Sequence, residues 1–252
     1  MRSDHVVLLF SGGVDSTVLA ALALEERRRL TALFIDYGQP AAEPEALAAQ
    51  GFLAPPWRDR CRSSSERASF VRRSLNLGDA VRPMLTPPRE RGPRVVPGRN
   101  LAMLAIARSL AETEGADEVW YGATAEDAAS YPDCRPTFVA ALNAIPGPRI
   151  VAPLLTYTRT DVLRLAAELG VEIGRTWSCY APLNALGFVP CGECDSCRQP
   201  RVLFGGVFGK RATTDATEDT PVEPLDLERV QGLIEASRNP PPGNAPALEP
   251  KP

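Results

Sequence analysis

Six consecutive residues near the N-terminus, Ser11-Gly12-Gly13-Val14-Asp15-Ser16, are of the types that bind phosphate groups. Glycines let the backbone approach phosphate oxygens, and the N–H groups at the start of a following helix point at the anion. Ser11, Ser16 and Thr17 add hydroxyl donors. The Asp15 carboxylate would repel phosphate unless it binds backbone N–H groups or Mg²⁺, so the run predicts a metal–nucleotide site. The alternative is a serine-glycine turn that only starts a helix.

Four cysteines follow the spacing C-x11-C-x2-C-x2-C, namely Cys179, Cys191, Cys194 and Cys197. Such cysteines can fill all four positions of a tetrahedral Zn²⁺ site, which is then structural rather than catalytic. The metal would order the zinc loop, residues 176–198, which has few apolar side chains. An iron–sulfur cluster is the alternative, and a reducing compartment disfavours disulfides. Cys61 and Cys134 lie outside the cluster, and we expect each to be a small buried residue, with a reactive thiol as the alternative.

A strand–loop–helix pattern surrounds the phosphate loop. His5 to Phe10 is an apolar run typical of a buried strand, and Ser16 to Leu24 has apolar residues at helical spacing. A second strand from Leu30 to Ile35 follows that helix, which favours parallel pairing. The same patterns predict four more elements: a helix at Asn100–Glu114, a strand at Glu118–Gly122, and helices at Thr137–Ile145 and Thr160–Leu169. We therefore expect an α/β fold with a doubly wound, mostly parallel sheet.

Two segments interrupt this pattern. From Pro40 to Pro97 prolines are frequent, and residues 58–99 contain eleven arginines. This composition predicts a solvated, partly irregular insertion, with an arginine surface for an anionic substrate or partner as the alternative. The proline-rich residues 212–252 predict a mostly disordered tail, with one short helix between Asp226 and Ser237.

Composition narrows the class of function. A chain of 252 residues with 44% hydrophobic content can form one enzyme-sized domain. The net charge of −3 gives no basic field for nucleic acid, which favours a small-molecule substrate. The N-terminal apolar run is too short for a membrane span and lacks a signal-peptide cleavage pattern, so we expect a soluble, cytoplasmic protein.

The phosphate loop has neither the lysine of GxxxxGK[ST] nor the spacing of GxGxxG. It resembles the SGGxDS loop of the ATP pyrophosphatase (PP-loop) superfamily, whose fold is of the adenine nucleotide alpha hydrolase-like (HUP) type. Members cleave ATP between the α- and β-phosphates and adenylate a substrate oxygen. Three further runs make the sequence resemble a divergent member of the 7-cyano-7-deazaguanine synthase (QueC) family: Pro97–Leu101, Gly122–Phe138 and Thr176–Tyr180. The matches run in order from about residue 6 to about residue 198.

The resemblance implies an AMP-forming carbon–nitrogen ligase of queuosine biosynthesis. Such an enzyme converts 7-carboxy-7-deazaguanine, ammonia and ATP into 7-cyano-7-deazaguanine through an acyl-adenylate and an amide, with Mg²⁺ and a structural zinc. Residues 1–211 would form the PP-loop ATP-binding ligase domain, including the zinc loop. An acyl-adenylate is reactive because it expels AMP instead of oxide, and a second adenylation lets the amide lose its oxygen.

The predicted catalytic residues are Asp15, Arg99, Asn100 and Arg159, the last of which stands where the family has a lysine. Arg99 and Asn100 offer a charged fork and an amide for phosphate or a developing pyrophosphate charge, unless Asn100 simply caps the helix. The predicted nucleotide contacts are Ser11, Gly12, Gly13, Val14, Asp15, Ser16, Thr17, Asp36 and Gly122.

Substrate contacts are expected after the third predicted strand. Glu126, Asp127 and Asp133 are carboxylates that could accept N–H donors of a guanine-like edge, with solvated turn carboxylates as the alternative. Tyr131 could stack on the heterocycle or serve as a core aromatic. The four cysteines complete the predicted sites as metal ligands.

This sequence departs from the family in three places. After Asp36-Tyr37-Gly38-Gln39 the family continues with Arg-His, whereas Pro40 and Ala41 stand here. Ala123-Thr124 replaces the usual valine and asparagine, and Arg159 replaces the lysine. The only histidine is His5, expected to be a strand residue, so the proton acceptor for ammonia would be a carboxylate, a phosphate or water.

Three functions remain open from the sequence. The first is the nitrile synthase itself. The second is a relative that adenylates a deazapurine-type carboxylate and joins it to another amine, on a protein or nucleic acid presented by the 58–99 segment. The third is a non-catalytic nucleotide-binding protein that contacts partners through its tail. Each is compatible with a homodimer.

Overall fold

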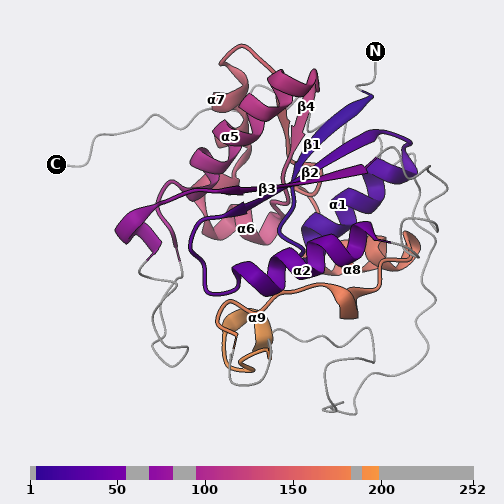
Figure 1. The fold of residues 1–252 in the computed structure, drawn as a ribbon, viewed down its shortest axis with the longest axis vertical. Coiled ribbons are helices and arrows are strands. Elements are labelled where there is room, and N and C mark those ends of the chain that lie inside the picture. Colours follow the sequence, from indigo (N-terminus) through magenta and orange to yellow (C-terminus); the bar gives the residue numbers. More distant parts are fainter. Residues whose placement is uncertain (1–3, 55–67, 82–94, 183–188, 199–252) are drawn as a thin grey trace.

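The computed structural model describes residues 4–54, 68–81, 95–182 and 189–198. Within these ranges, five parallel strands form one sheet in the order β3-β2-β1-β4-β5 (Figure 1). The strands are β1 His5–Leu9, β2 Arg29–Asp36, β3 Ala68–Ser74, β4 Glu118–Trp120 and β5 Arg149–Val151. The strand order reverses between β1 and β4, where doubly wound folds bind ligands at the carboxyl ends of the strands. The predicted α/β fold is confirmed.

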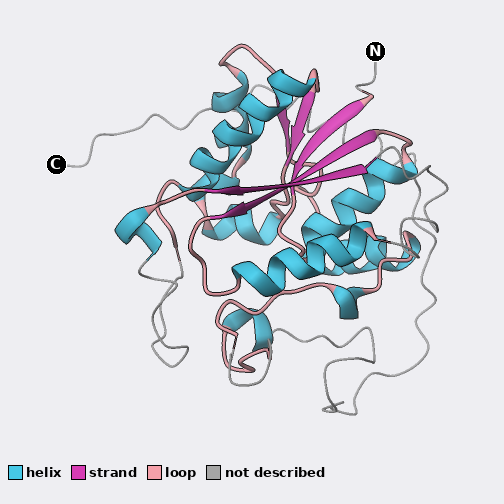
Figure 2. Ribbon diagram, in the orientation of Figure 1, coloured by secondary structure: helices cyan, strands magenta, loops and turns pink. Residues whose placement is uncertain are grey.

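Helices lie on both faces of this sheet (Figure 2). They are α1 Val14–Glu25, α2 Ala42–Leu53, α5 Arg99–Glu114, α6 Ala125–Ser130, α7 Pro136–Asn143, α8 Arg159–Glu168 and α9 Asp195–Arg198. Three short 3-10 helices, η1 Gly78–Val81, η2 Pro132–Cys134 and η3 Ile173–Arg175, complete the described elements. None of the helices in the described ranges is long and apolar enough to cross a membrane.

Side chains alternate between two buried clusters on opposite faces of the sheet. Val6 and Leu8 of β1 pack with α1 and α8, whereas Val7 packs with α5 and α7. A strand buried on both faces reads as a continuous apolar run, which is why β1 was predictable from sequence. The helix predicted to end near Gly115 is also confirmed, since Gly115 follows α5 with a φ of +66°.

The prediction of an irregular insertion from Pro40 to Pro97 is wrong for two segments, which form α2 and β3. Pro44 lies in the first turn of α2, where a missing N–H removes no helical hydrogen bond. β3 is the edge strand beyond β2, and its half-exposed, arginine-containing sequence lacks strict alternation. Residues 55–67 and 82–94 lie outside the described residues, as do Cys61, the 212–252 tail and its predicted helix.

Candidate active site and metal centre

The predicted phosphate loop connects β1 to α1 at the carboxyl edge of the sheet. The hydroxyls of Ser16 and Thr17 donate to the carbonyl oxygen of Gly13 at 3.1 and 2.8 Å. The hydroxyls of Ser11 and Ser16 lie 3.2 Å apart. Gly13 is the N-cap of α1 and has no side chain to cap the helix, and its backbone nitrogen donates to the Ser11 hydroxyl at 3.4 Å.

Gly12 is held against α2 by a close backbone approach. It has a φ of +73°, and a Cβ atom there would lie 2.5 Å from the Glu45 carbonyl oxygen and 2.8 Å from the Ala49 nitrogen. Only glycine fits this conformation and this space without displacing backbone. The contact fixes the loop relative to the first turns of α2.

Gly12→Ala is therefore expected to destabilise the fold by roughly 2–4 kcal/mol, since it adds left-handed backbone strain to an overpacked contact. Chemical denaturation would measure the loss. Gly51→Ala is the matched control. Gly51 lies in α2, the helix that Gly12 contacts, and no atom lies within 4 Å of the Cβ that alanine would add, so a gain of about 0.5–1 kcal/mol in stability is expected. Equal stability of Gly12→Ala and the parent would contradict the close approach.

Asp15 lies in the first turn of α1 and faces the end of β4. A Cβ atom on Gly122 would lie 3.2 Å from the Cβ of Asp15, so the structure brings these two predicted residues together. Burial raises the pKa of Asp15 to about 6; the positive charge of Arg159 opposes this, whereas Asp127 and Glu126 add to it. The site therefore combines one half-buried carboxylate with an arginine and two further acids.

Arg99 and Asn100 begin α5, and the Arg99 Nε donates to the Asn100 side-chain oxygen at 3.3 Å. The Arg99 guanidinium lies 5.8 Å from the ring centroid of Tyr37 and donates to its hydroxyl at 3.4 Å. The Asn100 amide donates to the Cys134 sulfur at 3.6 Å. The N-cap of α5 is Gly98, so the alternative in which Asn100 caps the helix is wrong. Cys134 is a small buried residue, as expected.

Two of the predicted substrate-binding carboxylates also hold helix ends. Asp127 and Thr124 form a capping box at the start of α6, in which both the nitrogen and the hydroxyl of Thr124 donate to Asp127 Oδ2. Glu126 Oε1 accepts from the backbone nitrogen of Arg159 at 2.9 Å. The Glu126 contact ties α6 to α8. Asp133 lies beside Cys134, and half-buried Tyr131 packs against the core under α5 and α7.

The Tyr121 hydroxyl is buried without a hydrogen-bond partner in the described part of the chain, and the residue is 5% exposed. Burial raises the pKa of this hydroxyl, and the neighbouring Cys134 and Asp133 raise it further. An unpaired buried hydroxyl opposes folding, so Tyr121→Phe is expected to increase the free energy of unfolding by about 1–2 kcal/mol. Tyr37→Phe, which removes the partner of Arg99, should instead lose about 0.5–1.5 kcal/mol. Denaturation of both variants tests the contrast, and a loss in Tyr121→Phe would contradict it.

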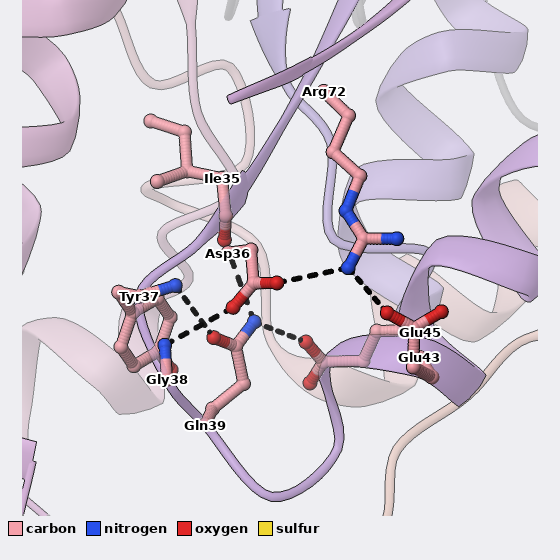
Figure 3. Close-up of polar contacts among 8 residues, drawn as sticks. All are labelled: Ile35, Asp36, Tyr37, Gly38, Gln39, Glu43, Glu45 and Arg72. Carbon is pink, nitrogen blue, oxygen red and sulfur yellow. Dashed lines mark hydrogen bonds and ion pairs between the residues drawn. The ribbon is translucent and has the colours of Figure 1, made fainter. Parts of the chain in front are cut away.

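Asp36 ends β2 at the centre of a polar network (Figure 3). Its carboxylate accepts from the Gly38 nitrogen at 3.1 Å and from Arg72 at 2.8 Å, and Arg72 also pairs with Glu43. Burial alone would raise the pKa of Asp36, but the hydrogen bonds from Arg72 and Gly38 lower it overall. Arg72 is thus paired with Asp36 and Glu43 of its own chain. A nucleotide that contacts Asp36, as predicted, would share the Asp36 carboxylate with Arg72 and the Gly38 nitrogen.

The four cysteine sulfurs lie within 4.8 Å of one another. A tetrahedral ion with metal–sulfur bonds of about 2.3 Å places its ligands about 3.8 Å apart, so the cage fits a single ion. A four-iron cluster would require a wider cage. The backbone nitrogen of Cys191 donates to the Cys179 sulfur at 3.2 Å, and that of Cys194 to the Cys191 sulfur at 3.4 Å. Donated N–H bonds of this kind stabilise thiolates.

Trp177 links the cysteine cluster to the phosphate loop. The backbone nitrogen of Trp177 donates to the Gly12 carbonyl oxygen at 2.9 Å, and the Trp177 indole donates to the Cys179 carbonyl oxygen at 2.8 Å. Trp177 and the buried cysteines also pack against Ala41 at the start of α2. A metal ion in this cage would therefore brace the loop that precedes α1.

Tyr180 and Glu45 join the site without having been predicted. Tyr180, 39% exposed, lies near enough to Arg99, Tyr131 and Arg159 for their charges to act on its hydroxyl. Its signal in the sequence was its place next to Cys179.

His5 lies at the other end of β1, where its ring nitrogen is 3.0 Å from the Thr31 hydroxyl, so it is a strand residue as expected.

A profile described as "Queuosine biosynthesis protein QueC" matches residues 5–204. Two relatives are each named 7-cyano-7-deazaguanine synthase. The one from Synechococcus sp. (strain CC9902) is 36% identical over 220 residues, covering 79% of this chain and 91% of the relative. The one from Gloeothece citriformis (strain PCC 7424) is 34% identical over 232 residues, covering 84% and 96%. Among solved structures, the U34-tRNA thiolase NcsA from Methanococcus maripaludis is 18% identical with a TM-score of 0.43, covering 68% of this chain and 59% of that one. The chain belongs to the QueC family of queuosine biosynthesis proteins.

Proposed function

We propose that this chain is an AMP-forming carbon–nitrogen ligase that converts 7-carboxy-7-deazaguanine and ammonia into 7-cyano-7-deazaguanine at the expense of ATP. The observation that carries the proposal is the convergence of the phosphate loop, Asp15, Gly122 and Arg99 at the carboxyl edge of the sheet. The names of the relatives, each aligned over most of its length, support the same reaction.

In this proposal, ATP binds with its phosphates at the N-terminus of α1, where Gly13 leaves the helix end free of a side-chain cap. Asp15 would hold Mg²⁺, which when bound neutralises charge on the phosphate oxygens. The Arg159 charge beside Asp15 keeps part of that carboxylate ionised despite burial. Arg99 can stabilise negative charge on the pyrophosphate as it leaves.

The reaction balances as two adenylations. A carboxylate oxygen of the substrate attacks the α-phosphorus and pyrophosphate leaves. Ammonia then attacks the acyl carbon, the bond between that carbon and the AMP oxygen breaks so that AMP leaves with the oxygen, and one proton is lost to give the amide. The amide oxygen attacks the α-phosphorus of a second ATP and pyrophosphate leaves. Loss of both N–H protons and of AMP, which carries away the former amide oxygen, gives the nitrile. Both adenylations can use the same phosphate site.

The substrate would enter from the β4 side of the site. Asp133 and the free oxygen of Asp127 can accept N–H donors, and the rings of Tyr131 and Tyr180 offer stacking surfaces. We also propose that the four cysteines bind one structural Zn²⁺, because the cage is the size for a single ion and all four positions are thiols. A reducing cytoplasm would keep those thiols available.

The test is mass spectrometry of products from ATP, 7-carboxy-7-deazaguanine and ammonium, with AMP and pyrophosphate measured alongside. Nitrile together with AMP supports the proposal. AMP without nitrile would point to transfer onto another amine, and no AMP would point to a nucleotide-binding role without catalysis.

A further inference from the structure

Glu45 lies in the first turn of α2, directly beside the phosphate loop. Its backbone carbonyl oxygen is the atom that a Cβ on Gly12 would meet. Its side chain extends from the helix toward the loop that follows β2 (Figure 3). The carboxylate is therefore close to the proposed phosphate site while belonging to a different element.

Gln39 fixes the orientation of that carboxylate. The Gln39 side-chain oxygen accepts from the Tyr37 backbone nitrogen at 2.9 Å, so its amide nitrogen must face the other way. There it donates to Glu45 Oε2 at 2.9 Å and to the Ile35 carbonyl oxygen at 3.4 Å. Gln39 is itself 4% exposed and cannot swing away into solvent. One oxygen of Glu45 is thus anchored, and the other, Oε1, has no hydrogen-bond partner among the described residues.

The groups that face Glu45 come from three elements: Asp36 at the end of β2, Tyr37 in the following loop, and Arg99 at the start of α5. Burial raises the pKa of Glu45 to about 7, with Asp36 adding to the rise, whereas the Gln39 hydrogen bond and the Arg99 charge oppose it. A carboxylate of this acidity can both accept and release a proton near neutral pH.

Four other carboxylates already have partners, although Glu126 and Asp127 use only one oxygen each. Both oxygens of Asp36 accept hydrogen bonds, and exposed Glu43 is paired with Arg72. Glu126 and Asp127 hold the ends of α8 and α6.

We propose that the Glu45 carboxylate is the proton acceptor for the amine nucleophile. The inference rests on the proposed function. As the amine nitrogen bonds to the acyl carbon and AMP leaves with its oxygen, one N–H proton passes to Glu45 Oε1. The anchored Oε2 keeps the carboxylate in place, and the proton then passes to water.

The experiment compares Glu45→Gln with the control Glu43→Gln from the same helical turn. Glutamine keeps an acceptor for Gln39, so folding is preserved. Adenylation is measured as exchange of pyrophosphate into ATP that depends on 7-carboxy-7-deazaguanine, and amide plus nitrile by mass spectrometry. Glu45→Gln should keep exchange within about threefold but lower amide formation from ammonium at neutral pH by about 100-fold, the typical contribution of a general base. Glu43→Gln should change neither.

Two further readouts separate proton transfer from positioning. At a constant concentration of free ammonia, amide formation by the parent should rise with pH through about 7, where Glu45 ionises, and Glu45→Gln should lack this rise. Hydroxylamine, whose conjugate acid is far stronger than ammonium, should restore the variant, because the cationic nitrogen formed when it attacks is acidic enough to lose its proton to water. Glu45→Asp, a shorter base, should be intermediate.

Unchanged amide formation in Glu45→Gln would overturn the assignment. Equal loss of exchange and amide formation would also overturn it, since Glu45 would then serve ATP binding. If the parent chain itself shows no exchange with 7-carboxy-7-deazaguanine, the proposed function fails and this assignment fails with it. If the parent shows pyrophosphate exchange and Glu45→Gln forms amide at the parent rate, the proposed function is supported and the role of Glu45 is refuted.

Discussion

Asp15→Asn is expected to lower AMP formation by at least about 10³-fold, equivalent to roughly 4 kcal/mol of transition-state stabilisation. Asparagine has nearly the same shape but no charge to hold Mg²⁺ beside the phosphates. The assay is AMP and pyrophosphate release with saturating ATP and 7-carboxy-7-deazaguanine. Raising the Mg²⁺ concentration should not restore the rate, because the ligand itself is lost.

The same substitution is expected to preserve or increase stability at pH 7.5. The pKa of Asp15 is about 6 in the fold and 3.8 in the reference state, so folding favours its protonated form. That contribution is fully present below pH 3.8 and is lost as pH rises through about 6. At pH 7.5 the buried charge therefore opposes folding by at most about 3 kcal/mol, which asparagine removes. The gain should shrink when unfolding is measured at pH 5.

Asp161→Asn gives the matched comparison, since Asp161 is also an aspartate in the first turn of a helix. Its carboxylate accepts from the nitrogen and hydroxyl of Thr158 in a capping box. Losing that cap should reduce stability by about 1 kcal/mol and leave AMP formation near the parent value. The two variants thus have opposite expected patterns. AMP formation by Asp15→Asn at the parent rate would refute the metal–nucleotide role.

Local chemistry explains which elements were predictable. β1 and α1 combine a continuous apolar run with glycines at a turn, and α5 ends at a glycine with positive φ. α2 was missed because Pro44 was counted as a loop signal, although the first helical turn tolerates proline. β3 and β5 are the two edge strands, and their short or half-exposed sequences give little periodicity.

The candidate site was predictable where one segment carries it. The phosphate loop and the cysteine cluster can each be recognised from residues that lie close together in the sequence. The approach of Glu45 to Gly12 depends on where α2 packs after the β2 crossover, which no local pattern encodes. Likewise, the spacing of Glu126 gave no sign that its carboxylate would hold the start of α8. The positions of Glu45 and Glu126 in the site therefore depend on tertiary contacts.

Cys194→Ser is expected to release the bound metal and to lower AMP formation together with it. Cys194 is 3% exposed and packs with Trp177, whose backbone nitrogen holds the Gly12 carbonyl oxygen. Without the fourth thiolate, metal affinity falls steeply and the loop loses the cross-link that orders it. We expect about 10-fold or greater loss of AMP formation at saturating ATP, because the phosphate loop loses its neighbour rather than a reacting group.

Elemental analysis of protein purified without air should find one zinc per parent chain and none in Cys194→Ser. Hydrogen exchange should show lost protection in the described residues 176–182 and 189–198 and at Gly12–Gly13, while the α5–α7 core is unchanged. Cys134→Ala is the control, since this buried thiol lies outside the cage and should retain the zinc. Iron with acid-labile sulfide in the parent would reject zinc. Metal loss with a parent-like rate would show that the metal centre does not brace the phosphate loop, despite the Trp177–Gly12 hydrogen bond.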